Sequence, residues 1–132
     1  MPLDSLENFK TGHQQIVAIV DQVQVLARSY GKAKPHLAAM KEILLAHFGR
    51  QNNDFFDRLR MFHKDDPKAA KMVEFLRHDL KDIKVQFLAF FDKYTGEMND
   101  SGSPAFLRDF AAFTNQVLAR IKIEEEYLFP LL

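Results

Sequence analysis

Two polar pairs with the same four-residue spacing are the clearest sign of chemistry in this sequence: His47 with Gln51, and Arg120 with Glu124. The pairs coincide when HFGRQNNDFFDRL is aligned with RIKIEEEYLFPLL, and a Phe and a Leu further along match as well. Residues at i and i+4 lie on one face of a helix. Each pair can therefore point at a common centre.

Each half of the chain also has an earlier His. His13 precedes the first pair and His78 precedes the second, in both cases by about the length of one helical hairpin. The sequence thus reads as two copies of a helix-loop-helix unit, each with a His on its first helix and a polar pair on its second. In a helical bundle, this arrangement of inward side chains builds a dinuclear metal site.

The residue types depart from a complete ligand set. The chain has no Cys, so any metal must be held by His, Asp or Glu. Gln51 is a neutral amide, and Arg120 cannot lose its proton to coordinate a metal. Since Arg120 lies four residues before Glu124, its guanidinium can reach the carboxylate that a metal would otherwise neutralise. We expect this organic cation to replace the missing ion.

The elements that position these residues are helical. Apolar residues recur at three- and four-residue steps almost throughout, and the alternation that a strand requires is nowhere sustained. Gly31 can end the first helix, and Pro35, Pro67 and Pro104 suit first helical turns. The sequence predicts an all-α, up-down-up-down four-helix bundle. Its predicted helices span residues 6–30, 35–61, 67–94 and 104–129.

Composition bounds the rest of the interpretation. At 132 residues and 47% hydrophobic, the chain suits one domain spanning residues 1–132. Its 18 basic residues balance 18 acidic ones, which gives no reason to expect binding to nucleic acid or to an anionic membrane. The N-terminus has no signal-peptide pattern and no apolar run is long enough to span a bilayer. We therefore expect a cytoplasmic protein.

The order of these motifs resembles the hemerythrin-like domain, also called the HHE cation-binding domain. The resemblance covers nearly the whole chain, and its strongest part is the ending, where a polar residue, two Glu and Leu-Phe-Pro follow at the family's spacing. It implies a four-helix bundle that holds a non-haem di-iron centre through histidines and two bridging carboxylates. Members of the family bind oxygen, store or sense iron, or sense redox state.

The resemblance also assigns positions. The family's ligand positions that keep a ligand-type residue are His13, His47, His78 and Glu124. Gln51 and Arg120 stand at ligand positions with the wrong chemistry. Asp82 stands where many members have a further His and offers an oxygen ligand instead. Glu125 and Glu126 are expected to be solvated.

The function favoured by these departures is that of a regulatory or sensory bundle with a degenerate, metal-poor di-iron site. No cofactor is expected; any that is bound would be non-haem iron, dinuclear or mononuclear, with dioxygen as a possible ligand of that metal. A protein partner is expected. The sequence has no nucleophile with an adjacent base and no phosphate-binding glycine loop, so we do not expect an enzyme.

Two other functions stay open. One is an iron- or oxygen-binding protein with an unusual ligand set, namely His13, His47, His78, Asp82 and Glu124. The other is an anti-sigma-type regulator, a class of four-helix proteins that shares the bundle shape and a loosely similar AHF stretch.

Overall fold

The computed structural model describes residues 6–28, 30–95 and 103–132, and all regular secondary structure in these ranges is helical. Five α-helices are followed by a π-helical turn, η1, and a 3-10 turn, η2. In chain order they are α1 (Leu6–Leu26), α2 (Tyr30–Gly49), α3 (Asn53–Phe62), α4 (Pro67–Thr95), α5 (Ser103–Ile123), η1 (Glu124–Leu128) and η2 (Phe129–Leu131).

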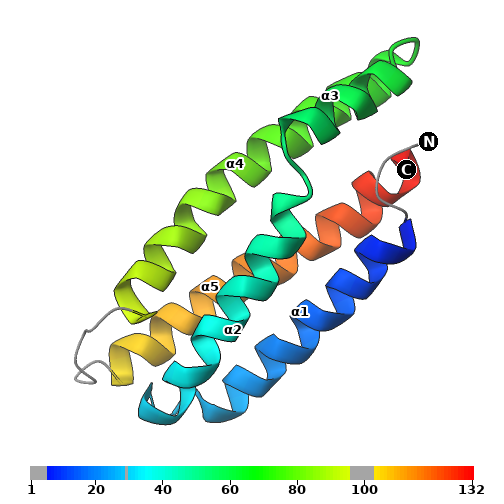
Figure 1. Cartoon of the computed structure of the whole chain (residues 1–132). Coiled ribbons are helices and arrows are strands. Elements are labelled where there is room, and N and C mark those ends of the chain that lie inside the picture. The colour runs from blue at the N-terminus through cyan, green and yellow to red at the C-terminus, as the bar shows by residue number, and fades with distance from the viewer. Residues whose placement is uncertain (1–5, 29, 96–102) are drawn as a thin grey trace.

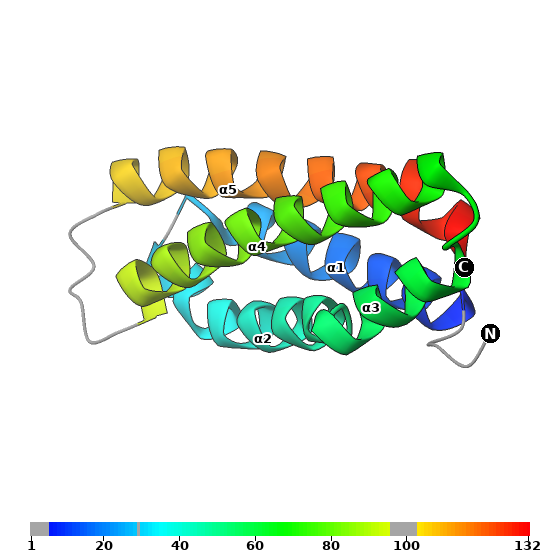
Figure 2. The same cartoon turned by 90° about the horizontal axis from the view of Figure 1, so that it is seen from above.

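The helices form an up-down-up-down bundle with four arms (Figure 1). Helices α2 and α3 follow one another along the second arm, and α4 returns beside both of them (Figures 1 and 2). The start of α1 and the end of η2 lie at the same end of the bundle. The predicted all-α, up-down-up-down bundle is thus confirmed.

Aromatic side chains fill much of the interior. Phe48 of α2 contacts Phe87 of α4 at a ring-centroid distance of 5.3 Å, and Phe87 contacts Phe113 of α5 at 5.2 Å. These three buried rings connect three arms of the bundle. Burying one such side chain contributes about 1.5–3 kcal/mol to folding. The bundle therefore has a continuous apolar core that can hold a few polar groups in fixed positions.

The boundary between the first two arms lies earlier than predicted. Helix α1 ends at Leu26 rather than Tyr30, and α2 begins at Tyr30 rather than at Pro35, which lies inside the helix. Proline removes one backbone donor near the helix start. Helix α2 nevertheless extends back past it, because a stripe of fully buried residues continues on both sides: Ala33, Leu37, Met40 and Leu44.

The predicted helix over 35–61 is interrupted. Helix α2 ends at Gly49, and α3 begins at Asn53 after a short bend. Asn52 has an extended backbone and caps α3, since its Oδ1 accepts a hydrogen bond from the Phe55 N–H at 2.9 Å. The bend places Gln51 between the two helices with 1% of its surface exposed.

The last predicted helix, 104–129, changes its hydrogen-bonding pattern at Glu124. The α-helix ends at Ile123, and in η1 the Phe129 N–H donates to the Glu124 carbonyl, five residues earlier. Pro130 has no N–H to continue an α-helical ladder. A π-helical turn widens the helix and shifts the direction of its side chains, and here the widened turn begins at a candidate ligand.

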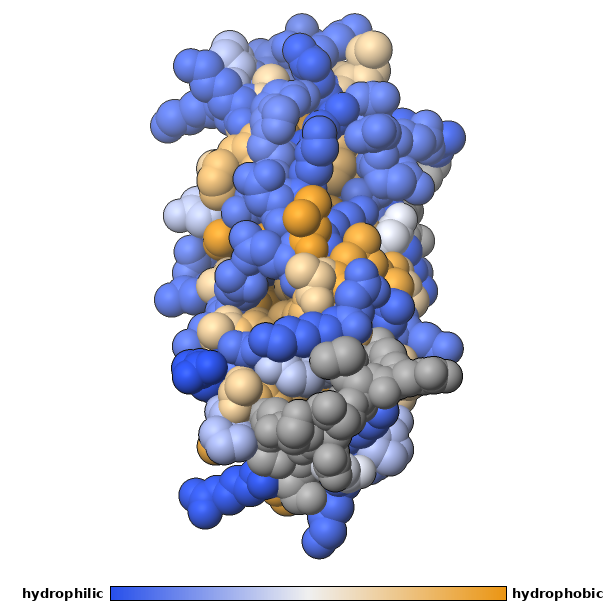
Figure 3. All heavy atoms as spheres, turned by 90° about the vertical axis from the view of Figure 1, so that its left-hand side faces the viewer, coloured by the Kyte–Doolittle hydropathy of each residue, from blue (hydrophilic) through white to orange (hydrophobic). Residues whose placement is uncertain are grey.

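One face of the bundle is mainly hydrophilic. Figure 3 shows this on one side, where a small group of apolar side chains interrupts the hydrophilic surface near the middle. No helix in the described ranges is both long enough and apolar enough to cross a membrane.

Candidate metal and guanidinium centre

The carboxylate of Glu124 lies at the centre of a buried polar cluster. Its Oε1 is 2.7 Å from His13 Nε2 and 2.9 Å from His47 Nε2. Its Oε2 accepts hydrogen bonds from Gln51 Nε2 at 2.9 Å and from Arg120 Nε at 2.8 Å. We call these five residues the central cluster. All five are buried, with exposed fractions of 0 to 4%.

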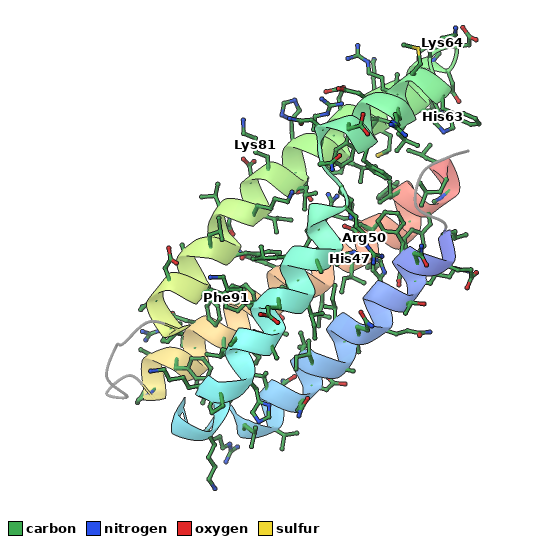
Figure 4. All side chains as sticks on the ribbon, in the orientation of Figure 1. His47, Arg50, His63, Lys64, Lys81 and Phe91 are labelled. Atoms are coloured by element: carbon green, nitrogen blue, oxygen red, sulfur yellow. The ribbon has the colours of Figure 1, made fainter. Side chains whose placement is uncertain are left out.

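Four helical segments and one bend supply the central cluster. His13 comes from α1, His47 from the last turn of α2, Gln51 from the bend before α3, and the other two residues from α5 and η1. In Figure 4, His47 and Arg50 lie near the end of α2 where this helix passes α5. The predicted contact between Arg120 and Glu124 is confirmed.

The Arg120 guanidinium is the largest polar group in the interior, and none of its surface is exposed. Besides Glu124, it donates from Nη2 to Gln51 Oε1 at 2.9 Å, and from Nη1 to the Leu76 carbonyl at 3.1 Å and to Asp79 Oδ2 at 3.0 Å. A buried charge needs both an opposite charge and hydrogen-bond partners. Arg120 has two carboxylates and two neutral acceptors.

His13 is bonded at both ring nitrogens. While Nε2 faces Glu124, Nδ1 lies 3.1 Å from Glu125 Oε2. Burial lowers the pKa of His13, but the hydrogen bonds and charges of the two carboxylates outweigh it and raise this pKa above 6.5. Glu125 was expected to be solvated; about half of its side chain is exposed, yet it orients a buried ring.

His47 depends on a close approach between α1 and α2. A Cβ added at Gly12 would lie 2.5 Å from His47 Nδ1, so a larger residue has no room there. This Nδ1 is buried and has no hydrogen-bond partner within the described ranges. With Nε2 donating to Glu124, an uncharged imidazole leaves Nδ1 as an unused acceptor rather than an unpaired donor.

The electrostatics of the cluster favour an ionised Glu124. Burial raises the pKa of this carboxyl, but the hydrogen bonds from His13 and His47 and the charge of Arg120 act in the other direction and hold the pKa far below its usual value of 4.5. Glu124 is therefore an anion held by donors on both oxygens.

Two predicted site residues do not reach the cluster. His78 and Asp82 are exposed on α4, which contributes Asp79 to Arg120 instead. Helical spacing explains this placement: Asp79 lies three residues after Leu76 and four before Ile83, on the apolar stripe of α4, and His78 lies outside that stripe. The position of Asp79 on this apolar stripe is the sequence signal that could have marked it as an inward-facing carboxylate.

Comparison with known families agrees with the bundle fold. The sequence profile described as Hemerythrin HHE cation binding domain matches residues 4–132. The chain belongs to this hemerythrin family. Among curated proteins and solved structures, no match was found.

The residues present do not fit the dinuclear iron centre that this hemerythrin resemblance implies. Arg120 fills one side of Glu124 with a fixed positive charge and Gln51 offers only an amide, while α4 supplies a carboxylate that is already paired with Arg120. The side of Glu124 that faces the two imidazoles is different. One donor atom each from His13, His47 and Glu124 lie within 4.8 Å of one another.

These three residues could hold a single metal ion. Two imidazole nitrogens and one carboxylate oxygen are a common donor set for iron and zinc. The contact between His13 Nδ1 and Glu125 is also of the kind that orients a ligand His from behind. Coordination would require both rings to release the proton on Nε2.

Two cavities lie beside the His side of the cluster. One, of about 270 Å³ between α1 and α2, is lined by Gly12 and His47, among others. A second, of about 420 Å³, is lined by His13, Glu125 and Phe129, among others. Both cavities thus border the His side of the cluster, whereas Arg120 fills the other side.

Proposed function

We propose that this hemerythrin-family bundle is a regulatory or sensory protein with a degenerate, metal-poor centre, in which the Arg120 guanidinium takes the place of one metal. The His side of the cluster then binds at most one cation. The observation that carries this proposal is the pairing of Arg120, a fully buried guanidinium that donates to four acceptors.

Glu124 explains how a guanidinium can fit a site built for metals. One carboxylate oxygen receives Arg120 and the other receives the two imidazoles. The carboxylate thus joins two positively charged or proton-donating groups, as a bridging carboxylate joins two metals. Removing the partner of a buried charge costs about 3–5 kcal/mol. Arg120 supplies such a partner to Glu124 when no metal is bound.

Metal analysis of protein purified without added metal tests the proposal. We expect fewer than two metal ions per chain, with any bound ion lost in the His47→Gln variant. Two tightly bound irons per chain would overturn it. As a control, His36→Gln changes a His outside the central cluster and should leave the metal content unchanged.

A second candidate function, iron or oxygen binding, is favoured by the convergence of three donor atoms within 4.8 Å. Iron(II) titration without oxygen, followed by exposure to air, separates the two candidates. An oxygen-binding centre would produce a visible absorption band that disappears in His13→Gln. The metal-poor centre would produce no such band, even where one iron binds.

The sensory part of the proposal has a physical basis in the hydrogen bonds of Glu124. A cation bound at the His side would remove two donors from Oε1 and would change the start of η1. We propose that this change is transmitted to a protein partner and that the protein does not act as a catalyst. Hydrogen exchange with and without zinc should differ most at the amides of η1; uniform exchange in α5 and η1 would contradict the sensory role.

A further inference from the structure

A cavity of about 410 Å³ opens where the bend between α2 and α3 meets α4, and it shares only Gln51 with the central cluster. Its size falls within the range of sites for small molecules. Its charged or titratable lining residues all come from α4: Arg77, His78, Lys81 and Lys84. Asn52, Asn53 and Gln51 add amide groups, and no carboxylate from the described part of the chain lines the cavity.

This charge distribution is unusual for the chain, whose formal net charge is zero. Arg77 is paired with Asp57 at 2.7 Å, which leaves the guanidinium against the Phe56 ring. For Lys81 and Lys84, no carboxylate partner is found in the ranges that the structure describes. Figure 4 shows Lys81 extending outward from α4. Lys81 and Lys84 therefore bring to the cavity positive charge that no described side chain neutralises.

Lys84 is in an unfavourable position for a positive charge. It is partly buried, and both burial and the charge of Arg120 lower its pKa. Arg120 lies behind the cavity wall, because Gln51 lines the cavity and accepts a hydrogen bond from Arg120 Nη2. An anion in the cavity would relieve the repulsion between these cations.

We propose that this cavity binds a small organic dianion, carrying phosphate or carboxylate groups, through Lys81, Lys84 and the amides of the α2–α3 bend. Gln51 belongs both to the cavity wall and to the central cluster, so the bound anion lies one side chain away from Arg120 and Glu124. The site does not depend on the proposed function, since its lining is the same whatever the metal content.

Titration with inorganic phosphate and with succinate, at constant ionic strength, tests the site by NMR of the side-chain amides. Saturable shifts of the Asn52, Asn53 and Gln51 amides are expected with at least one of the two anions. Phosphate alone would identify a phosphorylated ligand, succinate alone a carboxylate ligand, and both a general dianion site. The ionic strength is held constant because salt screens exposed charges and weakens their interactions.

Variants separate this cavity from general surface charge. Lys84→Gln is expected to weaken binding about tenfold, the loss of one charge-assisted hydrogen bond, and to fold normally because its charge is disfavoured in the folded protein. Lys71→Gln, which removes an exposed Lys on the same helix outside the cavity, is the matched control. The proposal is overturned if neither anion gives saturable shifts, or if Lys84→Gln binds as tightly as Lys71→Gln.

Discussion

Arg120 is the residue on which the interior charge balance depends. Arg120→Met should lower the free energy of unfolding by about 3–5 kcal/mol, because it leaves Glu124 and Asp79 without their shared cation. Arg108→Met, an exposed position on the same helix, should change it by less than about 0.5 kcal/mol. Urea unfolding measures both.

A double variant distinguishes loss of charge pairing from loss of packing. Arg120→Met with Glu124→Gln removes both members of the buried pair, so part of the lost stability should return. If the double variant is no more stable than Arg120→Met alone, the guanidinium acts through its volume rather than through its charge.

Gly12 provides a second test at a single position. Gly12→Ala places a Cβ 2.5 Å from His47 Nδ1, so the ring or α1 must move, and we expect a loss of about 1–3 kcal/mol. Gly49→Ala is the matched control, since nothing lies within 4 Å of the added Cβ. It should be neutral or stabilising by up to about 1 kcal/mol through helix propensity. Equal effects of the two variants in thermal unfolding would contradict the close approach.

At the scale of helices, apolar periodicity predicted the arms well, because each arm must bury one stripe. Helix α4 agrees with its predicted range to within one residue. Breaks were harder to predict, since they depend on local hydrogen bonds: the cap at Asn52 and the π-helical turn before Pro130. The candidate site was likewise predictable only in part. Spacing within a helix predicted the contact between Arg120 and Glu124, whereas the partner on α4 depends on how the helices are rotated against one another.

The cap at Asn52 leads to a prediction for the second arm. Asn52→Ala removes the acceptor for the Phe55 N–H and should cost about 0.5–2 kcal/mol in urea unfolding. Asn53→Ala changes the next residue, which makes no capping bond, and should cost less. Because the cap also fixes the bend that holds Gln51, only Asn52→Ala should shift the Gln51 amide signals. A larger loss in Asn53→Ala would contradict the assigned cap.

At the scale of the whole molecule, the two ends of the bundle are held by different forces. The central cluster joins α1, α2 and α5 through charged hydrogen bonds. Towards the other end, Phe90 stacks on Phe113 at a centroid distance of 4.2 Å, and Tyr94 packs edge-on against Phe106. The aromatic end does not share residues with the cluster. A change of protonation or ligand state in the cluster therefore removes none of these aromatic contacts directly.

Acid sensitivity provides a test of the aromatic end. The Tyr94 hydroxyl donates to Asp109 Oδ2, and Lys93 Nζ lies 2.9 Å from the same oxygen. The Tyr94 and Lys93 hydrogen bonds lower the pKa of Asp109 below 3.8. A carboxyl whose pKa is lower in the folded state stabilises the fold above its unfolded-state pKa, and this contribution is lost as the pH falls through the folded-state value. Tyr94→Phe should thus cost about 1 kcal/mol near neutral pH.

The difference between Tyr94→Phe and the parent protein should shrink as the pH falls below about 3.8, because protonated Asp109 is a weaker acceptor. Urea unfolding at a series of pH values measures this difference. Tyr127→Phe, at an exposed position in η1, is the control and should cost little at any pH. A cost for Tyr94→Phe that stays constant from neutral pH to pH 3 would mean that the hydroxyl contributes without the Asp109 charge. The contribution of the Tyr94 hydroxyl to the α4–α5 contact would then not depend on the ionisation of Asp109.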